Sequence, residues 1–322
     1  MKILAFILSS CFLPGAADAA SAKEKPRCLL VSSYHPGYAW SDGVEAGVRS
    51  TLKDTCELRQ FNMDTKRHKD EAAKEKAGRE AHELIERWKP DVVIAADDNA
   101  AKYLIVPYYK NKSLPIVFCG INWSAKTYGF PFRNVTGMVE VAPVRALLKA
   151  AAEISGGRKA LYIGADTLSE KKNLKWTQKA AAKQGITLDK RLVTNSAAWL
   201  KAYLRGQKDY AFVVIGSHAG IKDWDDERMR EQVLAKSRVL SVSVMNWMMP
   251  VTMLGMTKIP AEQGEWAASV ALEILKGHKA SEFPVLTNRQ WELWQNQRLL
   301  EKVGITLPER LKRKAKRVIN LE

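Results

Sequence analysis

The stretch NQRLLEKVGITLPERL, residues 296–311, is the most informative part of the chain. Gly304 stands where a helix would end in a left-handed cap, a conformation that glycine adopts without steric cost. Pro308 stands where a further helix would begin, because its fixed φ suits the first helical turn. The stretch therefore predicts two short helices near the end of the chain, separated by a short loop.

A wider pattern surrounds this stretch: an asparagine, a short helix, a glycine, a proline and a last helix that ends near Ala315 and Val318. It resembles the closing segment of one group of ABC-transporter substrate-binding proteins. Asn134-Val135-Thr136-Gly137 resembles the mid-chain crossing strand of the same group, which includes tryptophan- and tyrosine-type binding proteins. The resemblance implies the type I periplasmic binding protein fold, a small-molecule ligand and an ABC permease in the inner membrane as partner.

The N-terminus predicts export. Lys2 precedes an apolar run from Ile3 to Leu13, and small residues with the spacing of a cleavage site follow at 17–22. Residues 1–22 therefore predict a secretory signal peptide, since the run is too short to span a bilayer. Leu8-Ser9-Ser10-Cys11 has the form of a lipoprotein cleavage box, but the complete site downstream favours removal of the whole segment. We expect a periplasmic protein, with lipid anchoring through Cys11 as the disfavoured alternative.

The charge of the chain has to be interpreted in the light of export. A formal net charge of +16 and a pI of about 9.6 would suggest nucleic-acid binding in a cytoplasmic protein. Outside the cytoplasm we predict no nucleic-acid partner, and a monomer. Dense basic clusters occur at 66–69 and 312–317, and the simplest interpretation of both is a solvated helix face. The terminal cluster could otherwise meet anionic lipid headgroups or an acidic transporter surface.

Three cysteines remain after removal of residues 1–22: Cys28, Cys56 and Cys119. Cys28 and Cys56 each open an apolar run. If these runs form the first two parallel strands of one sheet, both sulfur atoms lie at the same edge, so we expect a disulfide between them. Cys119 lies within an apolar run and is predicted to be a buried apolar residue. No cysteine and histidine spacing fits a zinc site, so we predict no metal and no cofactor.

Short apolar runs alternate with longer segments of helical periodicity. The predicted strands are 28–32, 58–63, 92–96, 116–119, 160–164, 188–193, 211–215 and 239–244. The predicted helices are 41–52, 71–88, 141–154, 169–184, 196–205 and 225–236. Such alternation implies parallel sheets covered on both faces by helices. About 300 mature residues exceed what one such sheet needs, so we predict an α/β protein of two Rossmann-like lobes.

Two segments break the alternation and predict where the lobes are joined. Residues 134–139 predict a strand that leaves the first lobe, and residues 252–259 predict a strand that returns to it. A final stretch that reaches back across the junction would complete a three-strand hinge, as the resemblance also implies. The predicted lobes are residues 27–139 plus 260–322, and residues 140–259.

Ligands bind beyond the carboxyl ends of the strands in open α/β sheets. With two lobes facing each other, these ends would line a cleft whose closure traps a small molecule. The residues that follow each predicted strand are therefore the candidates. The candidate ligand-binding residues are Ser33, Tyr34, Tyr38, Trp40, Asp97, Asp98, Asn99, Asn122, Trp123, Asp166, Thr167, Ser217, His218, Asn246 and Trp247.

Several candidates have a structural alternative. Ser41 beside them could cap the helix that follows, and Asp98 could cap a helix that starts near residue 99. Trp40 and Trp123 could pack on a lobe surface, although aromatic side chains in loops at strand ends favour stacking on a ligand. A lone histidine such as His218 is more often a hydrogen-bonded structural residue than a metal ligand.

The chemistry of the candidates limits the ligand loosely. Asp97, Asp98 and Asp166 can neutralise an amine, while hydroxyls and backbone N–H groups at helix N-termini can hold a carboxylate. The aromatic side chains can enclose a flat or apolar body. A free amino acid, in particular an aromatic one, fits all three features, and the resembled family includes binders of aromatic amino acids. A small amide, an amine or a nucleobase-like compound fits nearly as well.

The class of function follows from what the sequence contains. It has no glycine-rich phosphate loop, no metalloprotease-type metal motif and no nucleophile in a recognisable setting, so we predict no catalytic residue and no enzyme. We expect an extracytoplasmic solute-binding protein of an ABC importer. A periplasmic sensor that reports occupancy to a membrane receptor such as a histidine kinase would use the same closure and is the alternative. The chain carries no receptor helix or signalling domain, which favours delivery.

Overall fold

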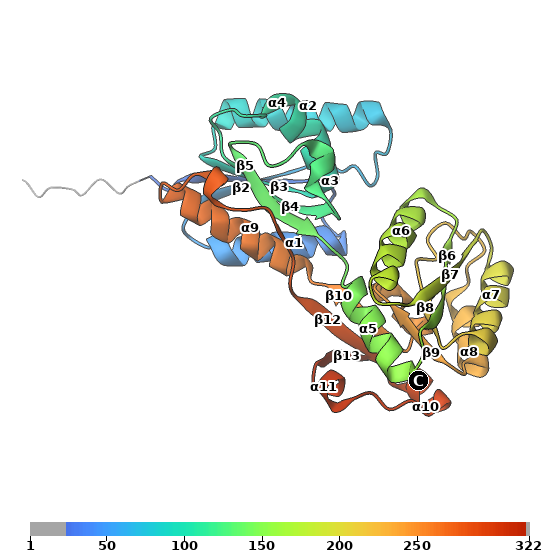
Figure 1. Cartoon of the computed structure of the whole chain (residues 1–322). Helices are drawn as coiled ribbons and strands as arrows, with labels where there is room; N and C mark the ends of the chain where they lie inside the picture. The colour runs from blue at the N-terminus through green and yellow to red at the C-terminus, as the bar shows by residue number, and fades with distance from the viewer. Residues whose placement is uncertain (1–23, 320–322) are drawn as a thin grey trace, which may run out of the picture.

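The computed structural model describes residues 24–319 and shows two α/β lobes, each built on its own sheet (Figure 1). The first sheet has six strands in the order β11-β5-β4-β3-β1-β2, all parallel. The second has seven strands in the order β13-β12-β10-β9-β8-β6-β7, with β12 antiparallel to β10. The prediction of two Rossmann-like lobes is confirmed. The predicted signal peptide, residues 1–22, lies outside the described residues.

The first lobe contains the elements from β1 to β5 and three later elements, α9, η4 and β11. Its elements are β1 (Arg27–Ser32), α1 (Ala39–Leu52), β2 (Glu57–Asn62), α2 (Glu71–Trp88), β3 (Val92–Ala96), α3 (Asp97–Ala100), the π-helix η1 (Ala101–Ile105), α4 (Val106–Tyr108), β4 (Ile116–Asn122), η2 (Ala125–Tyr128), β5 (Val135–Glu140), α9 (Pro260–Leu275), η4 (Ala280–Glu282) and β11 (Leu286–Thr287). Helices α1 and α9 cover one face of the sheet, and α2 and α4 cover the other (Figure 1).

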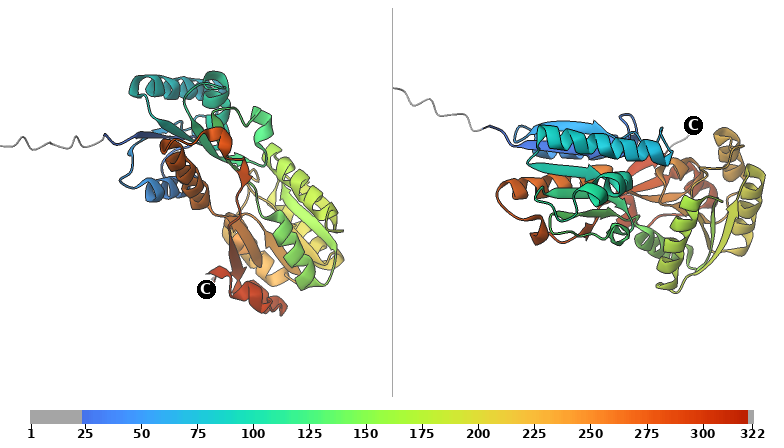
Figure 2. Two further views of the ribbon diagram at one scale, coloured as in Figure 1. Left: turned by 60° about the vertical axis from the view of Figure 1, so that its left-hand side comes forward. Right: turned by 90° about the horizontal axis from the view of Figure 1, so that it is seen from above.

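The second lobe contains the remaining elements. They are α5 (Val144–Ser155), β6 (Lys159–Ala165), α6 (Leu168–Ala182), β7 (Thr187–Val193), α7 (Ser196–Asp209), β8 (Phe212–Ile215), α8 (Asp226–Lys236), β9 (Leu240–Ser243), η3 (Asn246–Val251), β10 (Leu254–Lys258), β12 (Trp291–Asn296), α10 (Gln297–Val303), α11 (Glu309–Lys312) and β13 (Ala315–Ile319). Figure 2 shows both lobes from two further sides. The strands and helices predicted from periodicity are all present, with ends displaced by a few residues.

The disulfide expected from strand order is present in the structure. Cys28 lies in β1 and Cys56 directly precedes β2, and their Cα atoms are 5.8 Å apart. The two strands pair in parallel with Cys28 opposite Leu58, so both sulfur atoms lie near the same edge of the sheet. Cys119 in β4 is a free cysteine and is fully buried, as predicted.

The chain passes between the lobes three times. It crosses from β5 to α5, returns from β10 to α9, and crosses again from β11 to β12. Asn134 and Gly137, in the segment 134–137 at the start of the first crossing, each have a structural role. The Asn134 side chain donates to the Tyr109 and Leu114 carbonyls, and a Cβ at Gly137 would lie 2.3 Å from the Phe118 ring. The glycine therefore allows the phenylalanine ring to lie flat on β5.

The end of the chain corrects the lobe boundary expected from sequence. Residues 260–322 were expected in the first lobe, but the described residues from 291 onward belong to the second sheet. Strand β12 pairs with β10, placing Leu293 opposite Met256, and Leu299, Leu300 and Leu311 pack into the second-lobe core. The order of elements along a chain does not say which sheet edge will accept a late strand, and here the free edge of β10 does.

The closing motif is also corrected in part. Gly304 ends α10 in the left-handed conformation (φ 71°), and Pro308 directly precedes α11, as expected. The expected last helix ends at Lys312, however, and residues 315–319 form β13 instead of a helix near Ala315 and Val318. The basic residues 312–317 therefore run from the end of a helix into an edge strand. Among residues 24–319, no helix is long and apolar enough to cross a membrane.

Candidate ligand-binding site

The first-lobe half of the candidate site gathers at the carboxyl ends of β1, β3, β4, β5 and β10. Asp97 is its centre, in the first residue after β3. Its backbone is in the left-handed region (φ 73°), and its side chain is 2% exposed. The Trp40 indole N–H donates to Asp97 Oδ1 at 2.9 Å, whereas Asp97 Oδ2 is buried without a hydrogen-bond partner. A buried carboxylate oxygen without a hydrogen-bond partner is costly to folding, so its presence at the strand ends makes Asp97 the leading candidate residue of this lobe.

Burial raises the pKa of the Asp97 carboxyl to about 7, and the neighbouring charge of Asp98 adds to the rise. The Trp40 hydrogen bond and the positive charges of Lys66 and Lys258 act in the opposite direction. Gly120 makes room for this carboxyl, since a Cβ there would lie 2.6 Å from Asp97 Oδ1. The site thus holds a carboxyl group that ionises near neutral pH and has a free acceptor atom.

Two tyrosines and a lysine lie beside Asp97. The rings of Tyr34 and Tyr38 meet edge to face with centroids 5.2 Å apart. The Lys66 ammonium lies 4.6 Å from the centre of the first ring and 5.1 Å from the second. Burial raises the pKa of Tyr34 well above its usual value, and the charges of Asp97 and Asp98 contribute. The arrangement combines flat apolar surface with a mobile cation.

An ion pair joins the two crossing strands at the junction of the lobes. Glu140 ends β5 and Lys258 ends β10, and their side chains are paired. The Lys258 ammonium also lies 5.0 Å from the centre of the Trp40 ring. Burial lowers the pKa of Lys258 to about 8, against the effect of the nearby Asp97 carboxylate. The sequence analysis missed this pair because it did not apply the strand-end rule to the crossing strands.

Asp98 is held by its neighbours and presents no free oxygen in the described structure. Its Oδ2 accepts from the Asn122 side chain at 2.8 Å and from the Asn122 backbone N–H at 3.2 Å. Its Oδ1 accepts from the Tyr128 hydroxyl at 2.7 Å. Asn122 itself is exposed at the end of β4. Asp98 therefore orders the rim of the site and leaves the free acceptor to Asp97.

Two other first-lobe candidates serve packing. Ser33 is fully buried, and its hydroxyl donates to the Ala96 carbonyl at 2.6 Å and accepts from the Ala100 N–H at 2.8 Å. The Asn99 amide donates to the Thr65 hydroxyl at 2.7 Å. These bonds tie the loops after β1, β2 and β3 together. Ser33 is thus part of the support beneath the candidate site.

Neither helix cap considered for this lobe is present. Ser41 lies inside α1, whose N-cap is Tyr38, and its hydroxyl is buried without a partner. Asp98 lies inside α3, whose N-cap is Ala96. Neither N-cap residue makes a side-chain capping bond. Each helix begins earlier than its polar residue suggested: α1 begins at Ala39, after the loop 33–38, and α3 begins at Asp97, directly after β3.

The second-lobe candidates lie at the carboxyl ends of β6, β8 and β9. Asp166 pairs with Lys171 at 2.6 Å, and Thr167 caps α6 by accepting from the Glu170 N–H at 3.2 Å. The His218 ring is stacked on Trp224 with centroids 4.5 Å apart, and burial lowers the pKa of His218. A neutral, stacked histidine agrees with a structural role for this side chain. Asn246 and Trp247 are exposed on η3, with Trp247 51% exposed.

A buried carboxylate that the sequence analysis did not select supports this half. Glu170 is 1% exposed, and it accepts from the Tyr162 hydroxyl at 2.5 Å, the Ser217 N–H at 2.8 Å and the Asn173 amide at 3.2 Å. Burial raises the pKa of Glu170. A Cβ at Gly216 would lie 1.8 Å from Glu170 Oε1. The Thr167-x-x-Glu170 spacing is that of a capping box and could have drawn attention to Glu170. In the structure Glu170 instead binds the loop after β8.

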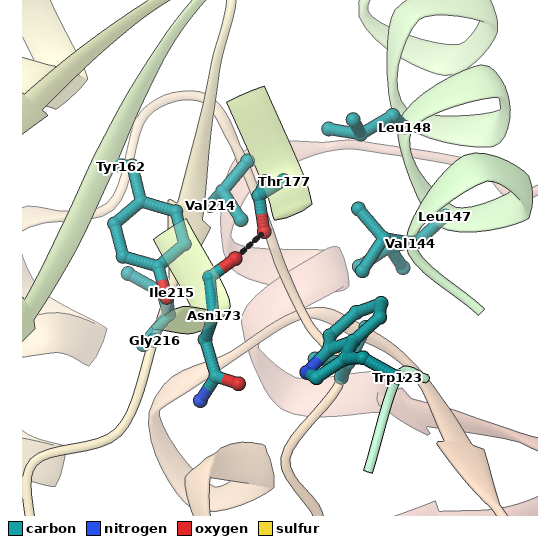
Figure 3. Close-up of a pocket in the computed structure, with 11 residues that line it drawn as sticks. Trp123, Val144, Leu147, Leu148, Tyr162, Asn173, Thr177, Val214, Ile215 and Gly216 are labelled. Atoms are coloured by element: carbon teal, nitrogen blue, oxygen red, sulfur yellow. Dashed lines mark hydrogen bonds between the residues drawn. The ribbon is translucent and has the colours of Figure 1, made fainter. Parts of the chain in front are cut away.

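A small apolar pocket adjoins this carboxylate at the face of the second lobe. Figure 3 shows the side chains around it, with Trp123 of the first lobe beside residues of α5, α6 and the end of β8. The indole of Trp123 is stacked on Trp176 of α6, with centroids 5.2 Å apart and planes 8° from parallel. The pocket residues are Trp123, Val144, Leu147, Leu148, Tyr162, Asn173, Thr177, Val214, Ile215, Gly216 and Val244. Among residues 24–319, no group of acidic, histidine or cysteine side chains forms a metal site.

The two lobes carry aromatic and charged groups at their strand ends. No protein-family model and no curated protein sequence matches the chain. Solved structures do match it, and they establish the fold. The chain has the fold of the type I periplasmic binding proteins.

Three of these structures indicate the range of the fold. A ligand-free, open substrate-binding protein with adhesive properties from Clostridium difficile is 14% identical, with TM-score 0.71, over 92% of this chain and 100% of that chain. An ABC domain in complex with L-Trp from Streptococcus pneumonia is 16% identical, with TM-score 0.58, over 91% and 99%. A LacI transcriptional regulator from Lactobacillus brevis is 12% identical, with TM-score 0.51, over 84% and 99%. The fold therefore serves more than one function.

Proposed function

We propose that the chain is an extracytoplasmic solute-binding protein that closes its two lobes on a small ligand and delivers it to an ABC permease. The observation that carries the proposal is the free acceptor atom of Asp97, buried among aromatic rings at the strand ends of the first lobe. A ligand amine would supply the hydrogen bond that this buried oxygen lacks. Solute-binding proteins among the matched structures support the same class.

The ligand that fits these groups is an amino acid, in particular an aromatic one. The ligand ammonium group would pair with Asp97 Oδ2, and the ligand carboxylate would meet Lys66 or Lys258, which lie over the rings of Tyr34 and Trp40. The flat side chain would lie against the aromatic rings. The matched L-Trp complex shows that this fold can hold such a ligand in another protein.

Closure would bring the second lobe onto the bound ligand. Trp247, half-exposed on η3, and the loop after β8 lie at the strand ends of that lobe. A ligand that contacts both lobes binds the closed form better and shifts the population toward it. The Glu140–Lys258 pair at the crossing strands lies where such a motion has its hinge. We assign the protein a monomeric state and no catalytic step.

The proposal is tested by identifying what the protein carries. The mature protein is purified without refolding, denatured, and the released small molecules are identified by mass spectrometry. A stoichiometric aromatic amino acid would support the proposal, and a different stoichiometric metabolite would correct only the ligand. An empty protein that is not stabilised thermally by amino acids or nucleobases would argue against cargo delivery and for a sensory role.

Trp40→Ala is expected to weaken binding of the released metabolite, or of L-tryptophan as a first probe. The substitution removes a ring beside the site and the N–H that orients Asp97, so the loss should be about 1–3 kcal/mol. Isothermal titration calorimetry gives the affinity. Trp40→Phe is the matched control, because it keeps a ring and removes only the N–H, and it should lose less. Unchanged affinity in a folded Trp40→Ala protein would exclude Trp40 from the site.

A further inference from the structure

Trp123 belongs to the first lobe by sequence but packs against the second. It directly follows β4, whose strand neighbours are β3 and β5 of the first sheet. Its indole nevertheless packs on the hydrophobic core of the second lobe and lines the pocket of that lobe. The contact spans the two lobes close to the crossing from β5 to α5, where the backbone N–H of Trp123 donates to the backbone carbonyl of Glu140 at 2.9 Å.

The backbone of Trp123 has a conformation that is unfavourable for a bulky residue. Trp123 has φ 63°, in the left-handed region that bulky side chains avoid. A residue with such a conformation persists only where its surroundings hold it there. The surroundings of Trp123 are the Trp176 ring, stacked 5.2 Å away, and a pocket that Val144 and Leu147 also line.

These groups form a slot for a flat ring. One wall is the Trp176 indole, which lies 8° from parallel to Trp123, and the Lys179 ammonium lies 4.6 Å from the centre of the same Trp176 ring. Figure 3 shows Val144 and Leu147 of α5 beside Trp123, and the Asn173 side chain across the pocket from them, near Tyr162 and Gly216. Offset stacking at this distance suits any planar aromatic ring of similar size.

We propose that this slot is the aryl subsite of the ligand and that Trp123 fills it until a ligand ring displaces it. The inference rests on the proposed function and names its ligand class: an amino acid whose side chain is a planar aromatic ring no larger than indole. The ring would stack on Trp176 while the amino group is held by the first lobe. Trp123 would then move out of the slot and relax its backbone.

An internal competitor has a measurable consequence. The apparent affinity for an aromatic ligand is lowered by the fraction of molecules in which Trp123 occupies the slot. If the slot is occupied about nine-tenths of the time, removing the indole should strengthen binding about tenfold. Trp123→Gly is the suitable variant, because glycine adopts φ 63° without strain and the fold loses no backbone compatibility. A residue that simply stacks on the ligand would have the opposite effect on removal.

The first experiment follows the two indoles directly. The protein is labelled with 5-fluorotryptophan, and the ¹⁹F resonances of Trp123 and Trp176 are assigned from Trp123→Phe and Trp176→Phe proteins. Adding L-phenylalanine should shift the Trp123 resonance toward that of a solvent-exposed indole. The resonance of Trp88, at the opposite edge of the first sheet beside Arg27, should stay unchanged. A Trp123 resonance that stays in place at saturating L-phenylalanine overturns the inference.

The second experiment compares affinities by calorimetry. Trp123→Gly should bind L-phenylalanine and L-tyrosine about tenfold more tightly than the unsubstituted protein and bind L-leucine with no gain. Trp88→Phe is the control for loss of an indole and should bind all three as the unsubstituted protein does. Weaker binding of the aromatic amino acids by Trp123→Gly overturns the inference, since Trp123 would then be a ligand contact.

Free indole separates this inference from the proposed function. Indole should bind Trp123→Gly, whose slot is open, about tenfold more tightly than the unsubstituted protein, and it should not bind the Trp123→Gly/Trp176→Ala double variant. If no amino acid binds any form but indole binds Trp123→Gly, the proposed cargo is wrong and the aryl slot stands. If amino acids bind and indole does not bind Trp123→Gly, the cargo class stands and the slot is refuted.

Discussion

Asp97→Asn is expected to bind an amino-acid ligand at least about thirtyfold more weakly than the unsubstituted protein. Asparagine keeps the shape of the side chain and tolerates the left-handed backbone of this position (φ 73°) better than other residues with a Cβ. It removes the negative charge and replaces the free acceptor oxygen, which would face the ligand ammonium, by an NH2 donor. Losing one partner of a buried charge pair costs about 2–5 kcal/mol. Calorimetry with L-tryptophan, or with the metabolite released from the native protein, measures the loss.

The same substitution is expected to make the protein more stable above neutral pH. The pKa of the Asp97 carboxyl is raised to about 7 in the folded protein, against about 3.8 in the unfolded chain, because the carboxyl is buried. The unfolded chain therefore binds fewer protons than the folded protein between these values, and stability falls as pH rises through them. Asp97→Asn should match the unsubstituted protein near pH 4 and exceed it by about 3–4 kcal/mol near pH 8.

Urea unfolding at the two pH values tests this prediction, with Asp209→Asn as the control. Asp209 is exposed at the end of α7 and pairs only loosely with Arg205, 3.5 Å away. Its loss should change stability by less than about 0.5 kcal/mol at either pH. If Asp97→Asn is more stable but binds the ligand with unchanged affinity, Asp97 does not contact the ligand, and its burial has no explanation in binding. A loss of stability at pH 8 would show that its free oxygen has a structural partner.

Gly264→Ala is expected to destabilise the first lobe by about 2 kcal/mol, although alanine is the better helix former. Gly264 lies in α9, where it meets α1, and a Cβ there would lie 2.0 Å from the Val44 carbonyl oxygen. Gly47 of α1 meets α9 in the same way, 2.3 Å from the Ala261 carbonyl oxygen. The obstacle on each side is backbone, which cannot rotate away. Overpacking typically costs about 1–3 kcal/mol, and a backbone obstacle places this case at the upper end, against about 1 kcal/mol gained from helix propensity.

Ser269→Ala in the same helix is the matched control. Ser269 is exposed, and its hydroxyl donates back to the Glu265 carbonyl at 2.7 Å. Replacing it should be neutral or slightly stabilising, because it raises helix propensity without touching α1. Thermal and urea unfolding compare the two variants. Equal stability of Gly264→Ala and the unsubstituted protein would mean that α1 and α9 can move apart at little cost. The position of Trp40, in the first turn of α1, would then not be fixed by the packing of these two helices.

Local sequence patterns predicted the helices and strands of this fold. Strand and helix periods are properties of neighbouring residues, so β3 at Val92–Ala96 and α2 at Glu71–Trp88 were predictable to within a residue. The Cys28–Cys56 disulfide followed from parallel strand order. The strand-end rule selected Asp97 and Trp40 as candidates, and the structure joins their side chains by a hydrogen bond.

Contacts between residues far apart in the sequence were decided only when the lobes assembled. The strand at 291–296 joined the second sheet because β10 offered a free edge, and no local pattern encodes that choice. Lys258, Glu140 and Glu170 became part of the site through burial and long-range pairing. The stacking of Trp123 on Trp176 depends on how one lobe rests against the other. Residue type and spacing set what each segment can form, whereas partner, burial and pKa depend on which segments the three-dimensional fold brings together.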